Sequence, residues 1–465
     1  MDVRNGLKAL SRAFGTTTAA LSFLTASTVF AQSAAPSPAF APAAPAAGGS
    51  PLKTVAREYE NGIKVGTKIT MANWQQYQAF MPDGMIELFK GTNFWKMPQD
   101  VEMNIGPTRI FPLPAGYPEA TEKYGGQTQM VKLPDGRYDL KNYIAGMPFP
   151  NPSDPDKGWK ILANSWYGPV PRIAAGTPET GLASLCALDK YGSSTCLKTA
   201  YVYRMLSHIY TPGYPLTEPN AGGAWYSEWA MLEAPEQSKY LANLTVFWQD
   251  NQKMEDDFAF IPSLRRTLRL SASARCSPIF GTDYTRDDAR GGFNGGIADF
   301  QADFLRDQKV LALSHITTAD GTFPGEYDMP LGFAKPSWGP WEVRDTYVID
   351  IRRIPQDAKG YCYGKRISYV DKVFMHENWS DLYDANMKLW KVLQLGAAPK
   401  VINGVETSVI GSFWAGMWDF QTSHATIAFT ADGPGRDIQI DDSVPKEYED
   451  IERYCTPAGM MMILR

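Results

Sequence analysis

Polar and apolar side chains alternate along residues 341–354 and again along residues 361–375. In the first run the apolar face is formed by Trp341, Val343, Tyr347, Ile349 and Ile351, with Asp345 as the one charged exception. In the second run it is formed by Tyr361, Tyr363, Ile367, Tyr369, Val373 and Met375. Alternation of this period is typical of β-strands with one buried and one solvated face. The two runs therefore predict part of a large antiparallel sheet whose other face is wet.

Further strand patterns lie on both sides of this stretch. They cover residues 225–232, 240–250, 258–271, 305–316 and 388–395, and residues 413–431 predict another strand or a helix. Neighbouring strands of this kind usually pair as hairpins. We therefore predict a mostly antiparallel sheet across residues 200–465, with covering helices.

The preceding part of the chain, residues 52–175, has a helical and irregular pattern with many prolines. Residues 73–90 carry apolar side chains at helical spacing, and Pro82 predicts their division into two short helices. Another short helix is predicted over residues 117–124. We expect this part to wrap the sheet, so that residues 52–465 form a single large domain.

The N-terminus, residues 1–31, has the pattern of a secretory signal peptide. Basic residues precede an apolar stretch of small side chains, and Ala31 predicts cleavage before Gln32. An uncleaved anchor is the alternative, although the stretch is short and weakly apolar for a spanning helix. Residues 32–51 are rich in Ala, Pro and Gly and have few side chains that could form a core. We expect this leader to be disordered.

The charge balance excludes one class of partner. The chain has 45 basic and 50 acidic residues, and mildly acidic proteins rarely bind phosphate backbones. We therefore predict no nucleic-acid partner. Since no apolar window outside the signal approaches the roughly 20 residues of a spanning helix, we expect a soluble protein of the periplasm.

The five cysteines of an exported chain predict disulfides. Cys186 and Cys196 flank a turn-forming segment and are the expected pair. The pairing of Cys276, Cys362 and Cys455 stays open, and the odd number leaves one sulfur unpaired in a monomer. Without a C-x-x-C pair or a close Cys/His cluster, the sequence predicts no metal site and no cofactor.

No complete catalytic signature occurs in the chain. The histidines, His208, His315, His376 and His424, have no partner at metal-ligand spacing. A G-x-S-x-G elbow and a phosphate-binding loop of the Walker type are both missing. The pattern around His376 favours a hairpin over a zinc helix.

Neighbouring carboxylates and a glycine-rich segment are the other candidates. Glu255, Asp256 and Asp257, and the pair Asp381 and Asp384, could act as general acids and bases, but their positions favour solvated turns between strands. Residues 272–303 contain closely spaced glycines and predict a mobile loop, which near a cavity could act as a lid.

Three arginines, Arg265, Arg266 and Arg269, lie within a predicted strand bounded by leucines. Arg266 shares the apolar face and therefore needs a partner. Pairing with Asp345 is one explanation, and binding the anionic head of an amphiphile is the other. The aromatic residues that could line such a pocket are Trp341, Tyr347, Tyr363, Tyr369 and Trp390, although core packing is the simpler explanation for them.

Three phrases together resemble one bacterial family of unknown function, often labelled outer-membrane lipoprotein-sorting-like proteins. They are YIAGMPFPNPSDPDKGWKI, FIPSLRRTLRL and YCYGKRISYVDKVFMHENWSDLYDANMKLWK, at residues 143–161, 260–270 and 361–391. The resemblance implies a fold similar to the Lol lipoprotein carriers, which is a strongly curved, unclosed half-barrel sheet with helices over its apolar concave face. It also implies a function together with a resistance-nodulation-division transporter of the inner membrane and an outer-membrane protein. The chain departs from the family in its cysteines, its proline-rich leader and its shifted arginine strand.

These observations favour a periplasmic carrier or accessory protein that binds a lipid or other lipophilic molecule for export or outer-membrane delivery. Burying ten methylenes is worth roughly 8 kcal/mol, so an apolar concave sheet needs no special chemistry to bind lipid. One alternative is a hydrolase or isomerase of a hydrophobic substrate that uses Glu255, Asp256, Asp257, Asp345 or His376. Another is a structural adaptor of a transport complex, which a filled sheet interior would favour. The weight of the sequence is against an enzyme.

Overall fold

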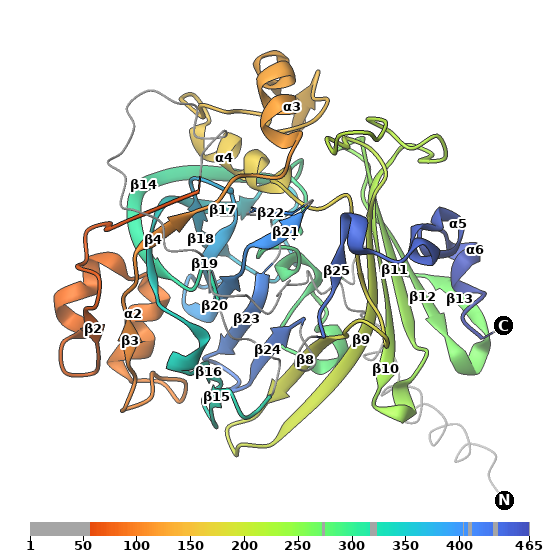
Figure 1. The fold of residues 1–465 in the computed structure, drawn as a ribbon. Coiled ribbons are helices and arrows are strands. Elements are labelled where there is room, and N and C mark those ends of the chain that lie inside the picture. The colour runs from red at the N-terminus through yellow and green to blue at the C-terminus, as the bar shows by residue number, and fades with distance from the viewer. Residues whose placement is uncertain are drawn as a thin grey trace, which may run out of the picture.

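The computed structural model describes residues 56–271, 275–316, 323–402, 404–407, 412–430 and 436–464. The predicted signal peptide, its cleavage site and the leader lie outside these residues. Within them a 15-stranded sheet dominates the structure (Figure 1). Every pair of adjacent strands in this sheet is antiparallel.

Hairpin neighbours make up most of the sheet. One arm runs in the order β13 (Arg266–Arg269), β12 (Asp256–Ile261), β11 (Ala242–Trp248), β10 (Ala224–Ala234), β9 (Ser194–Met205) and β8 (Ala183–Leu188). The other arm runs through β24 (Ala425–Phe429), β23 (Ser412–Asp419), β20 (Leu389–Ala397), β19 (Glu377–Tyr383), β18 (Lys365–Asp371), β17 (Glu342–Arg353) and β14 (Phe300–Ala312). The arms join where β24 pairs with β8, so the last long strand of the chain completes the sheet. Two short strands, β7 (Ile173–Gly176) and β25 (Gln439–Ile440), extend it beside β9.

The remaining elements are short. Two-stranded sheets pair β1 (Arg57–Tyr59) with β4 (Thr108–Ile110), β2 (Lys68–Ile69) with β3 (Met103–Asn104), β5 (Gln129–Lys132) with β6 (Tyr138–Lys141), β15 (Tyr327–Asp328) with β16 (Phe333–Ala334), and β21 (Lys400–Ile402) with β22 (Val405–Thr407). Among the described residues the α-helices are α2 (Asp83–Lys90), α3 (Tyr117–Tyr124), α4 (Lys157–Trp166), α5 (Ile451–Tyr454) and α6 (Pro457–Met460), and η4 (Trp74–Phe80) is the longest of the 3₁₀ helices.

The sheet bends strongly around one face. Tyr203 of β9 and Ile349 of β17 belong to the same apolar cluster, although several strands separate β9 from β17 in the sheet. Strands about 4.8 Å apart bring such residues together only when the sheet curves. Helix α4 lies in this concavity and contributes Trp159 and Trp166 to the cluster. The structure thus has the curved, unclosed sheet with covering helices that the sequence analysis predicted.

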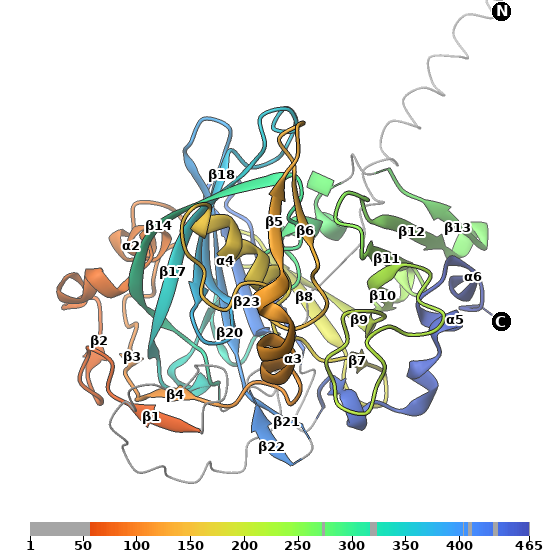
Figure 2. The same cartoon turned by 90° about the horizontal axis from the view of Figure 1, so that it is seen from above.

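The opposite face carries its own cover. Six tryptophans, Trp74, Trp95, Trp338, Trp379, Trp414 and Trp418, are buried there between the sheet and the segments around α2 and β15. Helix α2 approaches so closely that a Cβ at Gly84 would come within 2.2 Å of an oxygen of Asp381. Beside the other arm, α5 and α6 cover β9 to β13 (Figure 2).

Several local predictions are confirmed. Strands β10, β11, β14, β17, β18 and β20 overlap the expected ranges, although β14 begins five residues earlier than predicted, and residues 413–431 cover most of β23 and all of β24. Pro82 separates η4 from α2, and α3 covers the predicted residues 117–124. Both helix predictions hold because the local signals are strong: proline restricts the backbone, and glycine permits the left-handed conformation that ends α2 at Gly91.

Other predictions need correction. The sheet begins at β7, before residue 200, and α4 was not expected. Residues 258–271 form a hairpin, since the chain turns at Pro262–Leu264 and Arg265 has a φ of 47°. Asp381 lies buried in β19, which was expected to be a turn.

The face of β17 that was predicted to be wet is buried near its start. Glu342 accepts from Arg109 Nε at 3.0 Å, and Arg344 Nε lies 2.7 Å from Asp371. Burial alone would raise the pKa of Glu342, but His315 and the two arginines offset it, so the pKa falls to about 2. The charged residues pair with each other here, and alternation alone could not show this.

Candidate functional site

The concave face is covered by residues 275–299, which we call the covering loop. Every residue from 282 to 295 is buried, although the segment contains five glycines and many charges. The sequence predicted a mobile loop here, and the structure instead places it inside the molecule. Its backbone turns at Gly291 and Gly292, whose φ angles of 73° and 101° are costly for other residues.

Ion pairs hold one side of the covering loop to the turn before β12. Nη2 of Arg275 donates to both carboxylate oxygens of Glu255, at 2.6 and 2.8 Å, and Nη1 pairs with Asp287 at 2.7 Å. Arg286 pairs with Glu255 and Asp257. The prediction that Glu255 and Asp257 are solvated is therefore wrong. Their partners lie twenty or more residues later in the chain, beyond the reach of a local pattern.

The other side of the loop is attached near β18. Tyr361 and Tyr363 donate hydrogen bonds to Asp287 and Asp288 at 2.8 and 2.7 Å. Arg366 of β18 pairs with Asp288 at 2.5 Å. Two disulfides are present, the predicted Cys186–Cys196 pair and a Cys276–Cys362 pair that ties the start of the loop to the segment before β18, while Cys455 is a free, buried thiol.

Arg290 of the covering loop lies among aromatic rings. Its guanidinium carbon is 4.9, 4.9 and 4.6 Å from the ring centroids of Trp166, Trp225 and Tyr226. It donates to the backbone oxygen of Trp166 at 3.0 Å. Among the described residues, no carboxylate lies within 4.0 Å of this guanidinium, unlike Arg275, Arg286 and Arg366. Cation–π contacts, the backbone oxygen of Trp166 and the more distant charge of Glu228 stabilise the cation in place of an ion pair.

Glu228 on β10 is the carboxyl group that interacts electrostatically with Arg290. It is 1% exposed and accepts from Tyr201 at 3.3 Å and from Asn294 at 3.4 Å. Burial raises the pKa of Glu228 to about 7, although Arg290 lowers it. Burial also opposes the charge of Arg290, but Tyr226, Tyr203 and Glu228 raise its pKa, so the guanidinium stays charged. At neutral pH this site therefore combines a permanent cation with a carboxyl group that is partly protonated.

Two donors of this site have no hydrogen-bond partner in the part of the chain that the structure describes. They are Nε of Arg290 and Nε1 of Trp225, and both atoms are buried. Unpaired buried donors are uncommon in proteins. We call Arg290, Glu228 and the three rings the Arg290 site, and it offers donors to an anionic or carbonyl-bearing group.

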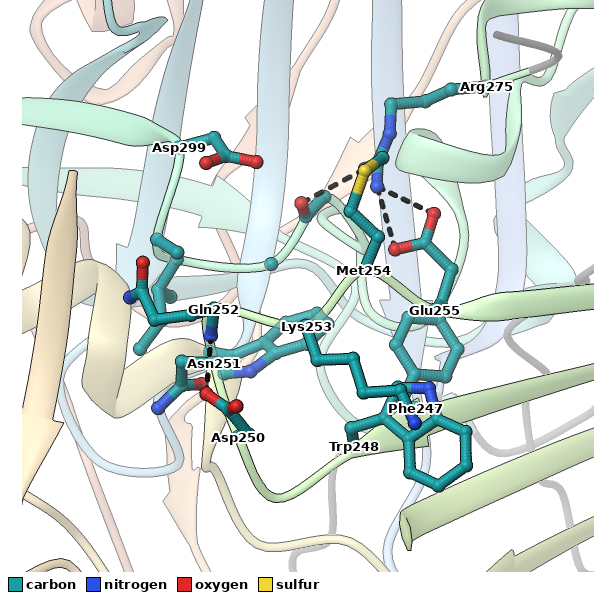
Figure 3. A pocket seen from close by; sticks show the side chains of 15 residues that line it. Phe247, Trp248, Asp250, Asn251, Gln252, Lys253, Met254, Glu255, Arg275 and Asp299 are labelled. Atoms are coloured by element: carbon teal, nitrogen blue, oxygen red, sulfur yellow. Dashed lines mark hydrogen bonds and ion pairs between the residues drawn. The ribbon is translucent and has the colours of Figure 1, made fainter. Parts of the chain in front are cut away.

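A small cavity lies beside the Arg290 site, between the covering loop and the turn after β11 (Figure 3). Its volume is about 40 Å³, and Trp166 and Phe247 form part of its wall. Lys253 extends over the ring of Trp248, and Glu255 faces Arg275 at the other side (Figure 3). Ligand pockets usually have about 300 to 1,000 Å³, so a lipid fits only after the loop moves.

The three predicted arginines do not reach this site. Arg265, Arg266 and Arg269 are exposed at the edge hairpin β12–β13, and Arg269 pairs with Asp256. Asp345 lies on β17, near the other edge of the sheet, and accepts a hydrogen bond from Asn61. Arg266 and Asp345 do not pair, which rules out one of the two explanations offered for Arg266. The turn at Pro262–Leu264 places Arg266 on a separate edge strand at the far end of the sheet (Figures 1 and 2).

The predicted aromatic residues are divided between the two faces. Trp341 and Tyr369 lie on the α2 side, where Tyr369 donates to Asp381 at 3.3 Å. Tyr347 borders the α4 cluster. Only Tyr363 and Trp390 meet, with ring centroids 5.6 Å apart beside the covering loop. The expected single stripe is therefore not formed.

The groups proposed for catalysis are also separate. Burial lowers the pKa of His376 to about 4, and its two ring nitrogens have no partner among the described residues. His208 is half-buried, and desolvation of its ring lowers its pKa to about 4, while His315 contacts Glu342 at 2.7 Å. In the described residues, no group of three or more His, Cys, Asp or Glu is arranged to hold a metal ion. Nor does any described helix have the length and apolar character needed to span a membrane.

Sequence reasoning missed Arg290, Glu228 and Trp225. The one available signal was the density of charges in residues 283–290, which is unusual for a glycine-rich connection. Long segments without regular structure are often functional, and this density could have moved attention from the arginine strand to the loop.

The chain belongs to the DUF1329 family, described as a protein of unknown function, whose profile matches residues 68–460. No curated protein matches the sequence significantly.

Solved structures show partial similarity. A DUF1329 family protein from Desulfovibrio piger is 12% identical and aligns over 65% of this chain and all 100% of its own, with a TM-score of 0.43. A domain described as an outer membrane lipoprotein-sorting protein from Vibrio parahaemolyticus is 15% identical, with 63% and 95% coverage and a TM-score of 0.42. A LolA superfamily protein from Nitrosomonas europaea is 14% identical, with 58% and 90% coverage and a TM-score of 0.33. These scores are low, so the fold rests on the strand pairing of this chain.

Proposed function

We propose that this protein binds an anionic lipophilic molecule on the concave face of its sheet, at the Arg290 site, as a periplasmic carrier or accessory protein. The observation that carries the proposal is the buried Arg290 cation, which has aromatic rings around it and no carboxylate at ion-pair distance in the described residues. An anionic head group would supply the missing charge, and the rings would contact its chain.

Binding requires the covering loop to separate from the sheet, since the present cavity is too small. The loop is attached largely through buried ion pairs and hydrogen bonds to Glu255, Asp257, Tyr361 and Arg366. Buried ion pairs contribute little net stability, because desolvation offsets most of their attraction. An anionic ligand can also take over part of the arginine contacts. We infer that the loop is the lid of the site, and that the cargo is exported or delivered to the outer membrane with a transporter of the resistance-nodulation-division class and an outer-membrane protein.

The test compares Arg290→Met with Arg266→Met. Protein purified from its native compartment is extracted with organic solvent for mass spectrometry, and the affinity for a fluorescent fatty acid is measured. Losing a charge-assisted bond costs about 1.5 to 3 kcal/mol, so we expect Arg290→Met to bind about 10 to 100 times more weakly. Arg266 is exposed, and its variant should bind like the wild type.

Two results would contradict the proposal. One is an extract without lipid together with a melting temperature that fatty acids do not raise. The other is equal binding by the two variants, provided that their melting temperatures show that both are folded.

A structural adaptor is the second candidate. The observation that favours it is the filled concave face, with a cavity of only about 40 Å³ at the loop. A lipid-free protein that still co-purifies with membrane partners would support this function over the carrier.

A further inference from the structure

The arginines of the β12–β13 hairpin lie on an exposed surface that the proposed carrier function does not use. Residues 263–266, in the turn of this hairpin, are all exposed. Leu264 is 51% exposed, and Arg265 and Arg266 follow it directly. Among the described residues, these two arginines form no ion pair within 4.0 Å, whereas Arg269 on the same strand does. We call Leu264, Arg265 and Arg266 the β13 tip.

The local sequence explains why the tip projects from the sheet. Pro262 begins a short 3₁₀ turn that ends at Leu264, and Arg265 then takes the left-handed conformation, with a φ of 47°. The chain returns as β13, in which Arg266 pairs with Ile261 of β12. β13 is the terminal strand of the sheet in the part of the chain that the structure describes. The tip therefore lies at the outer edge of the sheet.

The neighbouring turn, between β10 and β11, adds an aromatic side chain. The two turns lie at the same end of their strands, because Ala242 of β11 pairs with Phe260 of β12. Tyr240 in this turn is 37% exposed, and the ammonium group of Lys239 is 5.3 Å from its ring centroid. Tyrosine and lysine side chains have an apolar body and a polar end, which suits the boundary between water and lipid.

The carboxyl-terminal elements extend the same surface. The hydroxyl of Thr267 in β13 donates to the backbone oxygen of Pro457 in α6 at 3.4 Å. Residues 456–464 contain no charged side chain, and Met462 and Leu464 within them are 41% and 42% exposed. Figures 1 and 2 both show α6 beside β13 at one end of the molecule. This end therefore combines unpaired cations with exposed apolar side chains.

The local charge favours an anionic partner, although the whole chain is acidic. Residues 235–241 and 262–266, which form the two turns, carry three basic side chains and one acidic side chain, Glu236. Lys239 pairs with Glu233 at 3.8 Å, so the two tip arginines outnumber the remaining carboxylate. A soluble acidic protein would match these charges alone. An anionic bilayer would match the charges and also take up the apolar side chains between them.

We propose that the β13 tip binds the surface of a membrane that contains anionic phospholipids. The guanidinium groups of Arg265 and Arg266 donate to lipid phosphates, while Leu264 and Tyr240 enter the head-group layer. The contact brings the protein to the bilayer from which it takes its cargo or to which it delivers it. This surface is separate from the Arg290 site, and binding to it does not depend on a lipid inside the protein.

The test measures co-sedimentation of the full chain with vesicles of phosphatidylethanolamine and phosphatidylglycerol. A basic side chain near an anionic surface strengthens binding about fivefold, so Arg265→Gln/Arg266→Gln should bind roughly 25 times more weakly. The control, Lys64→Gln/Lys96→Gln, removes the same charge from exposed lysines near β2 and β3, at the opposite end of the molecule (Figures 1 and 2). It should bind like the wild type.

The apolar part of the tip is tested separately. Leu264→Ser keeps both arginines and should weaken binding about threefold or more, since the leucine side chain no longer leaves water. Leu305→Ser is the matched control, because Leu305 is 45% exposed on β14, at the other edge of the sheet. If Leu264→Ser bound the vesicles like the wild type, the tip would recognise charge alone. An acidic protein would then replace the bilayer as the partner, and the proposal would be overturned.

Other results would also overturn it. They are equal vesicle binding by the arginine variant and the lysine control, and wild-type binding to phosphatidylcholine vesicles that is as tight as to the anionic ones. Melting temperatures establish that each variant is folded. All four variants keep the Arg290 site, so they should bind the fluorescent fatty acid like the wild type. A protein that binds no fatty acid but still binds anionic vesicles would contradict the carrier function alone.

Discussion

The two faces of the central sheet are covered in different ways. On the side of α2 the cover is apolar, with six buried tryptophans and a helix in near contact at Gly84. On the concave side the covering loop brings buried arginines and carboxylates against the strands. Apolar burial is favourable without regard to partner, whereas buried charges need matched partners. The first cover should therefore belong to the folding core, and the second should be able to exchange its contacts.

The largest expected effect tests the apolar cover. Trp379 is fully buried and donates to the backbone oxygen of Leu311 at 2.8 Å. Replacing it in Trp379→Ala should lower the free energy of unfolding by about 3 to 5 kcal/mol, measured by urea denaturation. Tyr191→Ala, at a side chain that is 82% exposed, should change it by less than about 0.5 kcal/mol. If Trp379→Ala lowered the free energy of unfolding only slightly, the cover on the α2 side would not be part of the core.

The next effect tests the polar cover. Arg275→Met leaves Glu255 and Asp287 without one partner, which should cost on the order of 3 kcal/mol. We expect the loss to appear as local opening, so that hydrogen exchange of amides 283–296 accelerates far more than exchange of β19 and β20. Arg269→Met removes an exposed ion pair and is the matched control. It should leave the stability and the exchange rates of the loop amides unchanged. Uniform acceleration across the sheet would mean that the two covers open together.

A smaller effect depends on pH. Since the pKa of Glu228 is raised from 4.5 to about 7 by burial, its stabilising contribution is complete below pH 4.5 and declines as pH rises through 7. The full difference is on the order of 3 kcal/mol, and nearly all of it is lost by pH 8, above both pKa values. We therefore expect the protection of amides in the covering loop against hydrogen exchange to fall between pH 4.5 and pH 8. Glu228→Gln should remove this pH dependence.

The α2 side offers the matched comparison for this titration. Burial raises the pKa of Asp381 to about 7 as well, and its side chain accepts from the backbone of Gly84 at 3.1 Å. Asp381→Asn should flatten the pH dependence of exchange in α2 and leave that of the loop intact. If each variant altered both regions equally, the covers would be coupled.

Much of the fold could be predicted because its signals are local. Alternation located β17 and β18, Pro82 divided η4 from α2, and the turn between Cys186 and Cys196 indicated their disulfide. Backbone restriction and period-two burial act within a few residues, so a single sequence contains them. Helix α3 could be predicted for the same reason.

The tertiary structure alone decided the site. The pairing of β24 with β8 and the bending of the sheet join residues more than 200 positions apart, for which the sequence has no local signal. Arg290 could not be predicted as a site residue, because the aromatic rings around it come from α4 and β10. Arg266 was a candidate only because residues 258–271 were predicted to form one strand. Local patterns in the sequence indicated a large antiparallel sheet with covering segments, and the family resemblance implied its curvature. Long-range packing decided which arginine is buried without a carboxylate, because charge pairing in an interior depends on distance in space.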